Sequence, residues 1–121
     1  MSPGMTTKER AIALLDRRDY SRRELTKKLL EKGCDPDETE AVVDHLAEIG
    51  FVDDLRYSKL VVRHYAAKGY GAGRVRQELQ RRGIGRELWD EAMEQMPRQE
   101  EAIYAFKAQS RAVRRSSPTT P

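Results

Sequence analysis

Three alternating glycines, Gly69, Gly71 and Gly73, begin the stretch KGYGAGRVRQELQRRGI, which also carries four arginines. Glycine-rich turns of this kind can cradle a nucleotide phosphate when they follow a β-strand and open a helix. Here the preceding residues have the apolar spacing of a helix. The glycines are therefore predicted to form a tight turn between two helices and to hold no phosphate.

Other residue types that do chemistry lack the partners that catalysis or metal binding requires. His45 and His64 have no second metal ligand at helical spacing, and Cys34 is the single cysteine, which excludes an intramolecular disulfide. Asp53 and Asp54 are adjacent in the sequence, so they fit a helix cap and a first-turn charge better than an acid/base pair. We therefore predict a protein that is not an enzyme and uses no cofactor and no metal.

The composition favours helices as the elements that position these residues. Charged residues make up 36% of the 121 residues and aromatic residues 7%, so the apolar side chains must lie on narrow helical stripes. No apolar run approaches the roughly 20 residues that cross a bilayer, and the first residues lack the apolar core of a secretory signal. We expect an all-α protein of the cytoplasm with no membrane partner.

Start and stop signals divide the chain into short helices. Thr6 with Glu9, and Ser21 with Glu24, form the pattern of a capping box, in which each side chain binds the other's backbone N–H. Aspartates or glycines open the later helices, and glycines close most of them. The helices are predicted over 6–18, 21–32, 35–49, 53–68, 72–82, 85–96 and 98–115.

The two halves of the chain resemble each other. A displacement of 50 residues aligns Tyr70 with Tyr20, Leu79 with Leu29 and Gly83 with Gly33, positions that pack or turn. This pattern predicts an elongated array of tandem, helix-turn-helix-like three-helix repeats. The first repeat would span 7–50 and the second 51–97, with 98–115 opening an incomplete third repeat and 116–121 forming a flexible tail.

Charge is segregated in the same way in both repeats. The middle helices are basic, and their candidate DNA- or partner-binding residues are Arg22, Arg23, Lys27, Lys28 and Lys32 in the first repeat and Arg74, Arg76, Arg81 and Arg82 in the second. The third helices are acidic, and their candidate partner-binding residues are Asp44, Glu48, Asp90 and Glu94. Two readings stay open. Neighbouring helices of opposite charge could attract weakly, or the basic stripe could face an anionic polymer and the acidic stripe a basic protein surface.

Tyr20 and Tyr70 precede the two basic helices and are further candidates for partner binding. Each lies in a turn beside a cap residue or a glycine, where its ring could pack against the turn or stack on a base.

The segments YSRRELTKKL, IGFVDDLRYS and KGYGAGRVRQELQRRGI resemble the RecX family of bacterial regulatory proteins, and the resemblance extends from Arg10 to about Met96. It implies tandem three-helix repeats that bind and restrain the RecA recombinase. Family members are expected to lie in the groove of the RecA filament on single-stranded DNA and to suppress strand exchange and ATP hydrolysis. Such proteins usually carry a complete third repeat, and that pattern is missing after Met96.

The resemblance predicts RecA filaments as the main partner, weak or indirect contact with single-stranded DNA, and a monomeric chain. The alternative is an autonomous, nonspecific DNA-binding helical module. Sequence-specific reading of bases is not expected in either case, because Gln77 and Gln80 are the only amide side chains on the two basic helices.

Overall fold

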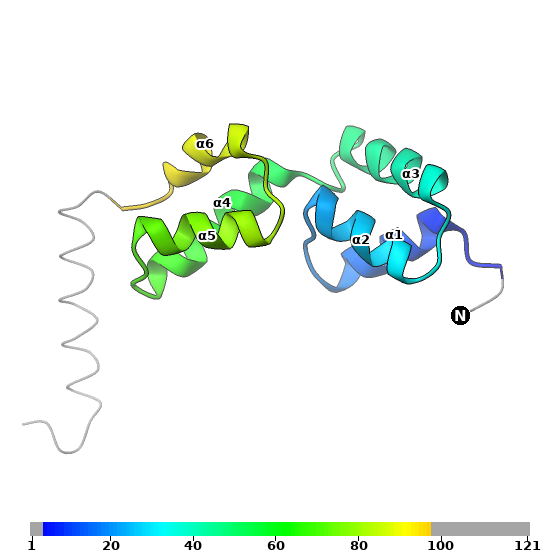
Figure 1. Cartoon of the computed structure of the whole chain (residues 1–121), viewed down its shortest axis with the longest axis horizontal. Helices are drawn as coiled ribbons and strands as arrows, with labels where there is room; N and C mark the ends of the chain where they lie inside the picture. Colours follow the sequence, from blue (N-terminus) through cyan, green and yellow to red (C-terminus); the bar gives the residue numbers. More distant parts are fainter. Residues whose placement is uncertain (1–3, 98–121) are drawn as a thin grey trace, which may run out of the picture.

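The computed structural model describes residues 4–97, and every regular element in this range is helical, as predicted. The first three-helix unit contains α1 (Thr7–Arg17), α2 (Arg22–Glu31) and α3 (Pro36–Glu48). The second contains α4 (Asp54–Ala67), α5 (Ala72–Arg81), the short 3₁₀ helix η1 (Arg86–Leu88) and α6 (Trp89–Met93). Figure 1 shows the two units side by side along the longest axis of the molecule.

Local capping fixes where the helices begin. Both predicted capping boxes are present: Thr6 pairs with Glu9 at the start of α1, and Ser21 pairs with Glu24 at the start of α2. Asp35 and Asp53 accept backbone N–H groups at the starts of α3 and α4. These contacts satisfy amide groups that have no partner within the helix. The stretch with three glycines behaves differently, because Gly71 at the start of α5 offers no side chain to cap it.

Each unit has an apolar core of its own. Leu25 and Leu29 of α2 are completely buried, and so are their counterparts Val75 and Leu79 of α5. In the first unit they pack with Ala11, Val43, Leu46 and Val52. In the second they pack with residues of α4, with Ile84 and with Ala92, while Trp89 lies against this core. The displacement of 50 residues therefore aligns apolar positions of the middle helices that are buried in the core of both units.

The third helix of the second unit is shorter than predicted. The sequence pattern predicts one helix over 85–96, whereas the structure has η1 followed by the five-residue α6. Gly85 provides no side-chain cap, in contrast to Asp35 before α3. The indole N–H of Trp89 donates to the carbonyl of Ile84 at 3.0 Å, which ties the segment back to the end of α5. The segment 98–115, predicted to be helical, and the tail 116–121 lie outside the described residues.

Candidate functional site at the repeat junction

The two units meet where α2 begins and α5 ends. The hydroxyl of Ser21, which is completely buried, donates to the backbone carbonyl of Arg82 at 2.5 Å and also accepts the N–H of Glu24 at 3.0 Å. The helix-capping serine of the first unit is therefore also a direct link to the second. Leaving a buried hydroxyl without a hydrogen-bond partner costs free energy. This contact therefore favours the arrangement of the two units in which Ser21 reaches Arg82.

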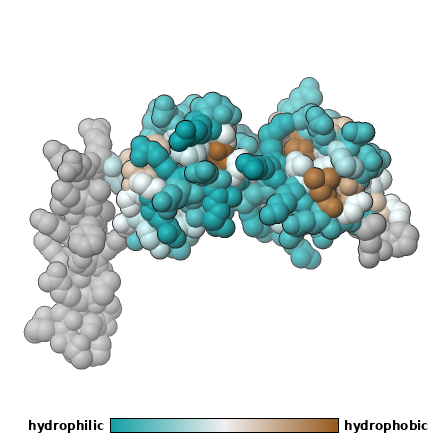
Figure 2. Space-filling model, in the orientation of Figure 1, coloured by the Kyte–Doolittle hydropathy of each residue, from teal (hydrophilic) through white to brown (hydrophobic). Residues whose placement is uncertain are grey.

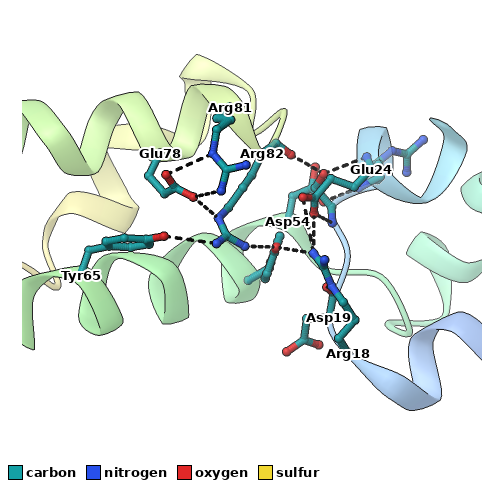
Figure 3. Close-up of polar contacts among 11 residues, drawn as sticks. Arg18, Asp19, Glu24, Asp54, Tyr65, Glu78, Arg81 and Arg82 are labelled. Carbon is teal, nitrogen blue, oxygen red and sulfur yellow. Dashed lines mark hydrogen bonds and ion pairs between the residues drawn. The ribbon is translucent and has the colours of Figure 1, made fainter. Parts of the chain in front are cut away.

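The phenol of Tyr57, on α4, joins two arginines from different units. Its oxygen accepts from Arg82 at 2.6 Å and from Arg18 at 3.1 Å, and Arg18 also forms an ion pair with Glu24 at 3.4 Å. Figure 3 shows Arg18, Glu24 and Arg82 converging between the two units. Burial, assisted by the charge of Glu24, raises the pKa of Tyr57, so the phenol stays neutral at physiological pH.

Asp54 connects the units on the same side. One oxygen of its carboxylate accepts the backbone N–H of Arg22, the first residue of α2, at 2.8 Å. Burial raises the pKa of Asp54 above its ordinary value, although the hydrogen bond from Arg22 acts in the opposite direction. The sequence predicted Asp54 as a first-turn charge of its own helix, and the structure shows that it also binds the start of a helix in the other unit.

Glu78 anchors the two arginines at the end of α5. Its side chain is almost completely buried and forms ion pairs with Arg81 and Arg82. Hydrogen bonding from Arg81, with further help from Arg82 and against the effect of burial, lowers the pKa of Glu78 from 4.5 to about 2. The carboxylate is therefore charged throughout the physiological range and holds both guanidinium groups in place.

This pKa predicts an acid-sensitive contribution to stability. A carboxylate with a lowered pKa stabilises the fold fully above its unfolded value of 4.5, and this contribution is lost as the pH falls through about 2. We expect the free energy of unfolding, measured with urea between pH 7 and pH 2, to fall more steeply in the wild type than in Glu78→Gln. Parallel profiles for the two proteins would contradict the prediction.

A basic groove of about 630 Å³ lies between α2 and the end of α5. Six of its lining residues are cationic and two are anionic, and both units contribute: Arg18, Arg23, Lys27, Lys28, Arg81 and Arg82, with Glu24 and Glu31. The side chains of Arg23, Lys27 and Lys28 form no ion pair with the described residues. This groove can therefore offer uncompensated positive charge to an anionic chain.

The predicted basic residues divide into several groups. Arg23, Lys27 and Lys28 line the basic groove, whereas Arg81 and Arg82 reach it while bound to Glu78. Arg22 forms an ion pair with Asp44 instead. The other three lie away from the groove: Lys32 beside a small hollow near α1, Arg74 over the ring of Tyr70 and Arg76 exposed on α5.

The two candidate tyrosines occupy different environments. Tyr20 lies against the core of the first unit and beneath the guanidinium of Arg18, 4.3 Å from the ring centre. Tyr70 is 41% exposed and contacts Tyr65, with 5.5 Å between ring centres. Both rings thus take part in packing, and the exposed part of Tyr70 is the larger surface for a partner.

The predicted acidic residues do not gather at the junction. Asp44 of α3 forms an ion pair with Arg22 of α2. Glu48, Asp90 and Glu94 are exposed on α3, on α6 and just beyond it, and none of them forms an ion pair within residues 4–97. The two units therefore do not bind each other through these carboxylates, and the junction uses Glu24, Asp54 and Glu78 instead.

Sequence reasoning missed five junction residues as links between the units, namely Arg18, Ser21, Glu24, Asp54 and Tyr57. The signal that could have found all but Arg18 is the polar composition of the YSRRE and VDDLRYS segments, which lie near each other only after folding. Within the described residues no three His, Cys, Asp or Glu side chains are grouped to hold a metal ion. Over the same range no helix is long and apolar enough to cross a membrane.

Gly83 is the tightest backbone position of the junction. It has a φ of +76°, and a Cβ atom there would lie 2.7 Å from the Cβ of Arg23. Gly33, its counterpart, has a φ of +88° with open space around it. We expect Gly83→Ala to lower the free energy of unfolding by about 2 kcal/mol and Gly33→Ala by about 1 kcal/mol, since only the former adds a clash to the backbone strain. Urea unfolding of both variants measures the difference, and equal losses would mean that Arg23 moves aside freely.

Comparison with known proteins finds two family models that match separate parts of the chain. Residues 8–46 match the family model described as RecX, first three-helix domain, and residues 53–93 match RecX, second three-helix domain. Relatives named Regulatory protein RecX include that of Vibrio campbellii, which is 40% identical over 79% of this chain and 62% of its own length. Those of Xanthomonas axonopodis pv. citri and Halorhodospira halophila are 43% and 38% identical over 73% and 88% of this chain, and 54% and 63% of their own lengths. The chain thus spans less than two thirds of the relatives it matches.

Proposed function

Because this chain belongs to the RecX family of regulatory proteins, we propose that it binds RecA filaments and inhibits or modulates their recombination and ATPase activities. In this proposal the chain acts as a monomer in the cytoplasm, as a regulator and not as an enzyme. The observation that carries the proposal is the basic groove, which both units build together at a fixed junction. A filament with DNA along its axis is a partner to which such a two-unit surface is suited.

The groove would supply weak, nonspecific contact with single-stranded DNA. Its uncompensated cations, Arg23, Lys27 and Lys28, can bind phosphates of any sequence. Contacts made by two linked units reinforce each other, because docking of the first raises the effective concentration of the second. Weak contact with DNA can in this way support firm binding to a nucleoprotein filament.

The test is RecA-catalysed ATP hydrolysis on single-stranded DNA. We expect this chain to slow hydrolysis at substoichiometric to equimolar ratios to RecA. A catalytically inert basic protein of similar size and charge controls for simple competition for DNA. Undiminished hydrolysis at saturating concentrations of the chain would reject the proposed function.

The alternative is an autonomous, nonspecific DNA-binding module, and the free cations of the basic groove favour it because they require no second protein. Binding measured with RecA alone, with DNA alone and with the assembled filament separates the two functions. A RecA regulator binds the filament more tightly than DNA alone. An autonomous module binds bare DNA at least as tightly.

A further inference from the structure

A second groove, of about 1000 Å³, lies between α2 and α3 of the first unit. Leu30 and Pro36 form its exposed apolar lining, with Thr26 beside them and Val43 at its floor. Leu30 is 43% exposed although it lies on a helix whose other leucines are completely buried. Figure 2 shows hydrophobic surface on the lobe of the first unit, surrounded by hydrophilic surface. The α2/α3 groove therefore exposes apolar surface to water. The fold itself does not require this exposed apolar surface.

The second unit lacks the same apolar residues. The displacement of 50 residues places Gln80 at the position of Leu30 and Arg76 at that of Thr26. Arg86 takes the position of Pro36, within a third helix that is much shorter. Because the two units share their core positions but differ here, core packing does not require Leu30. Its exposure in the first unit therefore points to a contact made outside residues 4–97.

The two edges of the α2/α3 groove differ in charge. The α2 edge is mainly basic, with Arg22, Arg23 and Lys27 against Glu31, and the α3 edge is acidic, with Glu40 and Asp44. The ion pair between Arg22 and Asp44 joins the helices at one end, and Leu30 and Pro36 lie toward the other. An occupant must therefore present apolar side chains between an acidic edge and a basic edge, a pattern that an amphipathic helix provides.

The α2/α3 groove and the basic groove lie on the two flanks of one helix. Arg23, Lys27 and Glu31 line both, whereas Leu30 lines only the α2/α3 groove and Lys28 only the basic groove. The first is apolar at its centre, and the second is lined mainly by cations. The α2/α3 groove therefore suits a protein ligand, and the basic groove on the other flank of α2 suits an anionic chain.

We propose that the α2/α3 groove receives an amphipathic helix of the protein partner, which under the proposed function is a subunit of the RecA filament. Its apolar stripe packs on Leu30 and Pro36, its acidic side chains face Arg23 and Lys27, and its basic side chains face Glu40. The ten residues of α2 give a groove about 15 Å long, which accommodates two to three turns of a bound helix. This inference rests on the proposed function and assigns its protein contact to one surface.

The test replaces Leu30 by the residue that the second unit has at this position. Leu30→Gln removes the apolar anchor from an exposed site, and Leu60→Gln on α4, where the leucine is 36% exposed and outside the groove, is the matched control. Binding is measured to RecA without DNA, to RecA filaments on single-stranded DNA and to single-stranded DNA alone. Thermal unfolding of each variant checks that the fold is retained.

We expect Leu30→Gln to weaken binding to RecA at least tenfold, with and without DNA, and to leave binding to bare DNA unchanged. Leu60→Gln should bind like the wild type in all three assays. Glu40→Lys, which reverses a charge on the α3 edge without touching the apolar lining, should also weaken binding to RecA.

Several outcomes would overturn the inference. Equal affinities of Leu30→Gln and Leu60→Gln for RecA would show that the α2/α3 groove is not the protein contact, while the proposed function would stand if the wild type binds. A self-association of the wild type that Leu30→Gln abolishes would assign the groove to a second copy of this chain. Absence of any RecA binding by the wild type would reject the proposed function together with the inference.

Discussion

Replacement of Arg82 by alanine is expected to lower the free energy of unfolding by about 3 kcal/mol, because it leaves the carboxylate of Glu78 buried with one guanidinium fewer. The side chain of Arg82 is only 20% exposed. It donates to Glu78 at 2.8 Å and to Tyr57 at 2.6 Å, and it thus joins the core of the second unit to the junction. Urea unfolding at pH 7 measures the loss.

Arg81→Ala provides the matched control. Arg81 also binds Glu78, but its side chain is 68% exposed and makes no contact with Tyr57. We expect a loss of about 1 kcal/mol, since an exposed partner in an ion pair contributes little. If both variants lost the same stability, the link to Tyr57 would contribute nothing.

Arg82→Ala should also loosen the junction between the two units. Without Arg82, Arg18 is the one hydrogen-bond donor to the phenol of Tyr57 that remains within residues 4–97. Spin labels on Cys34 in the first unit and on Asp90→Cys in the second would report a broader distance distribution in Arg82→Ala than in Arg81→Ala. An unchanged distribution would mean that Ser21 and Asp54 hold the junction alone.

A rigid junction matters for binding because it determines whether both units can dock at once. Two linked sites gain affinity only when their spacing and orientation match those of the partner. Arg18, Tyr57 and Arg82 are therefore positioning residues in the proposed function. They hold the two halves of the basic groove together, while Arg23, Lys27 and Lys28 are left free to make contacts.

The features that sequence analysis predicted well depend on residues close together in the chain. A capping box needs two residues three positions apart, and a helix-ending glycine needs only its own backbone. Ser21 with Glu24, and Gly33 with its positive φ, accordingly appear in the structure as predicted. The all-helical fold follows from such local signals together with the apolar spacing.

The function of single charged residues could not be predicted in this way. Arg82 is predicted to bind DNA or a partner, and the sequence did not indicate that its guanidinium also contacts Tyr57, 25 residues away, and Glu78. Arg22 and Asp44 were predicted on opposite binding surfaces, and they pair with each other. Such pairings depend on which helices meet after folding, and a charge pattern along one helix does not specify them.

The second large effect is expected from the free cations of the basic groove. Combined replacement of Arg23, Lys27 and Lys28 by alanine should weaken binding to single-stranded DNA and to RecA filaments at least tenfold. It should also reduce the slope of log affinity against log salt concentration by about two, because each phosphate contact with a single strand contributes about 0.7. Stability should change little, since none of the three side chains forms an ion pair with residues 4–97.

The matched control removes the same charge from outside the basic groove. Lys8, Arg56 and Arg63 are exposed and do not line it, so their combined replacement by alanine should preserve most of the affinity and leave the salt slope nearly unchanged. Equal effects of the two triple variants would mean that DNA responds only to net charge. A slope that falls only in the groove variant would locate the phosphates at the junction, because overall charge is the same in both proteins.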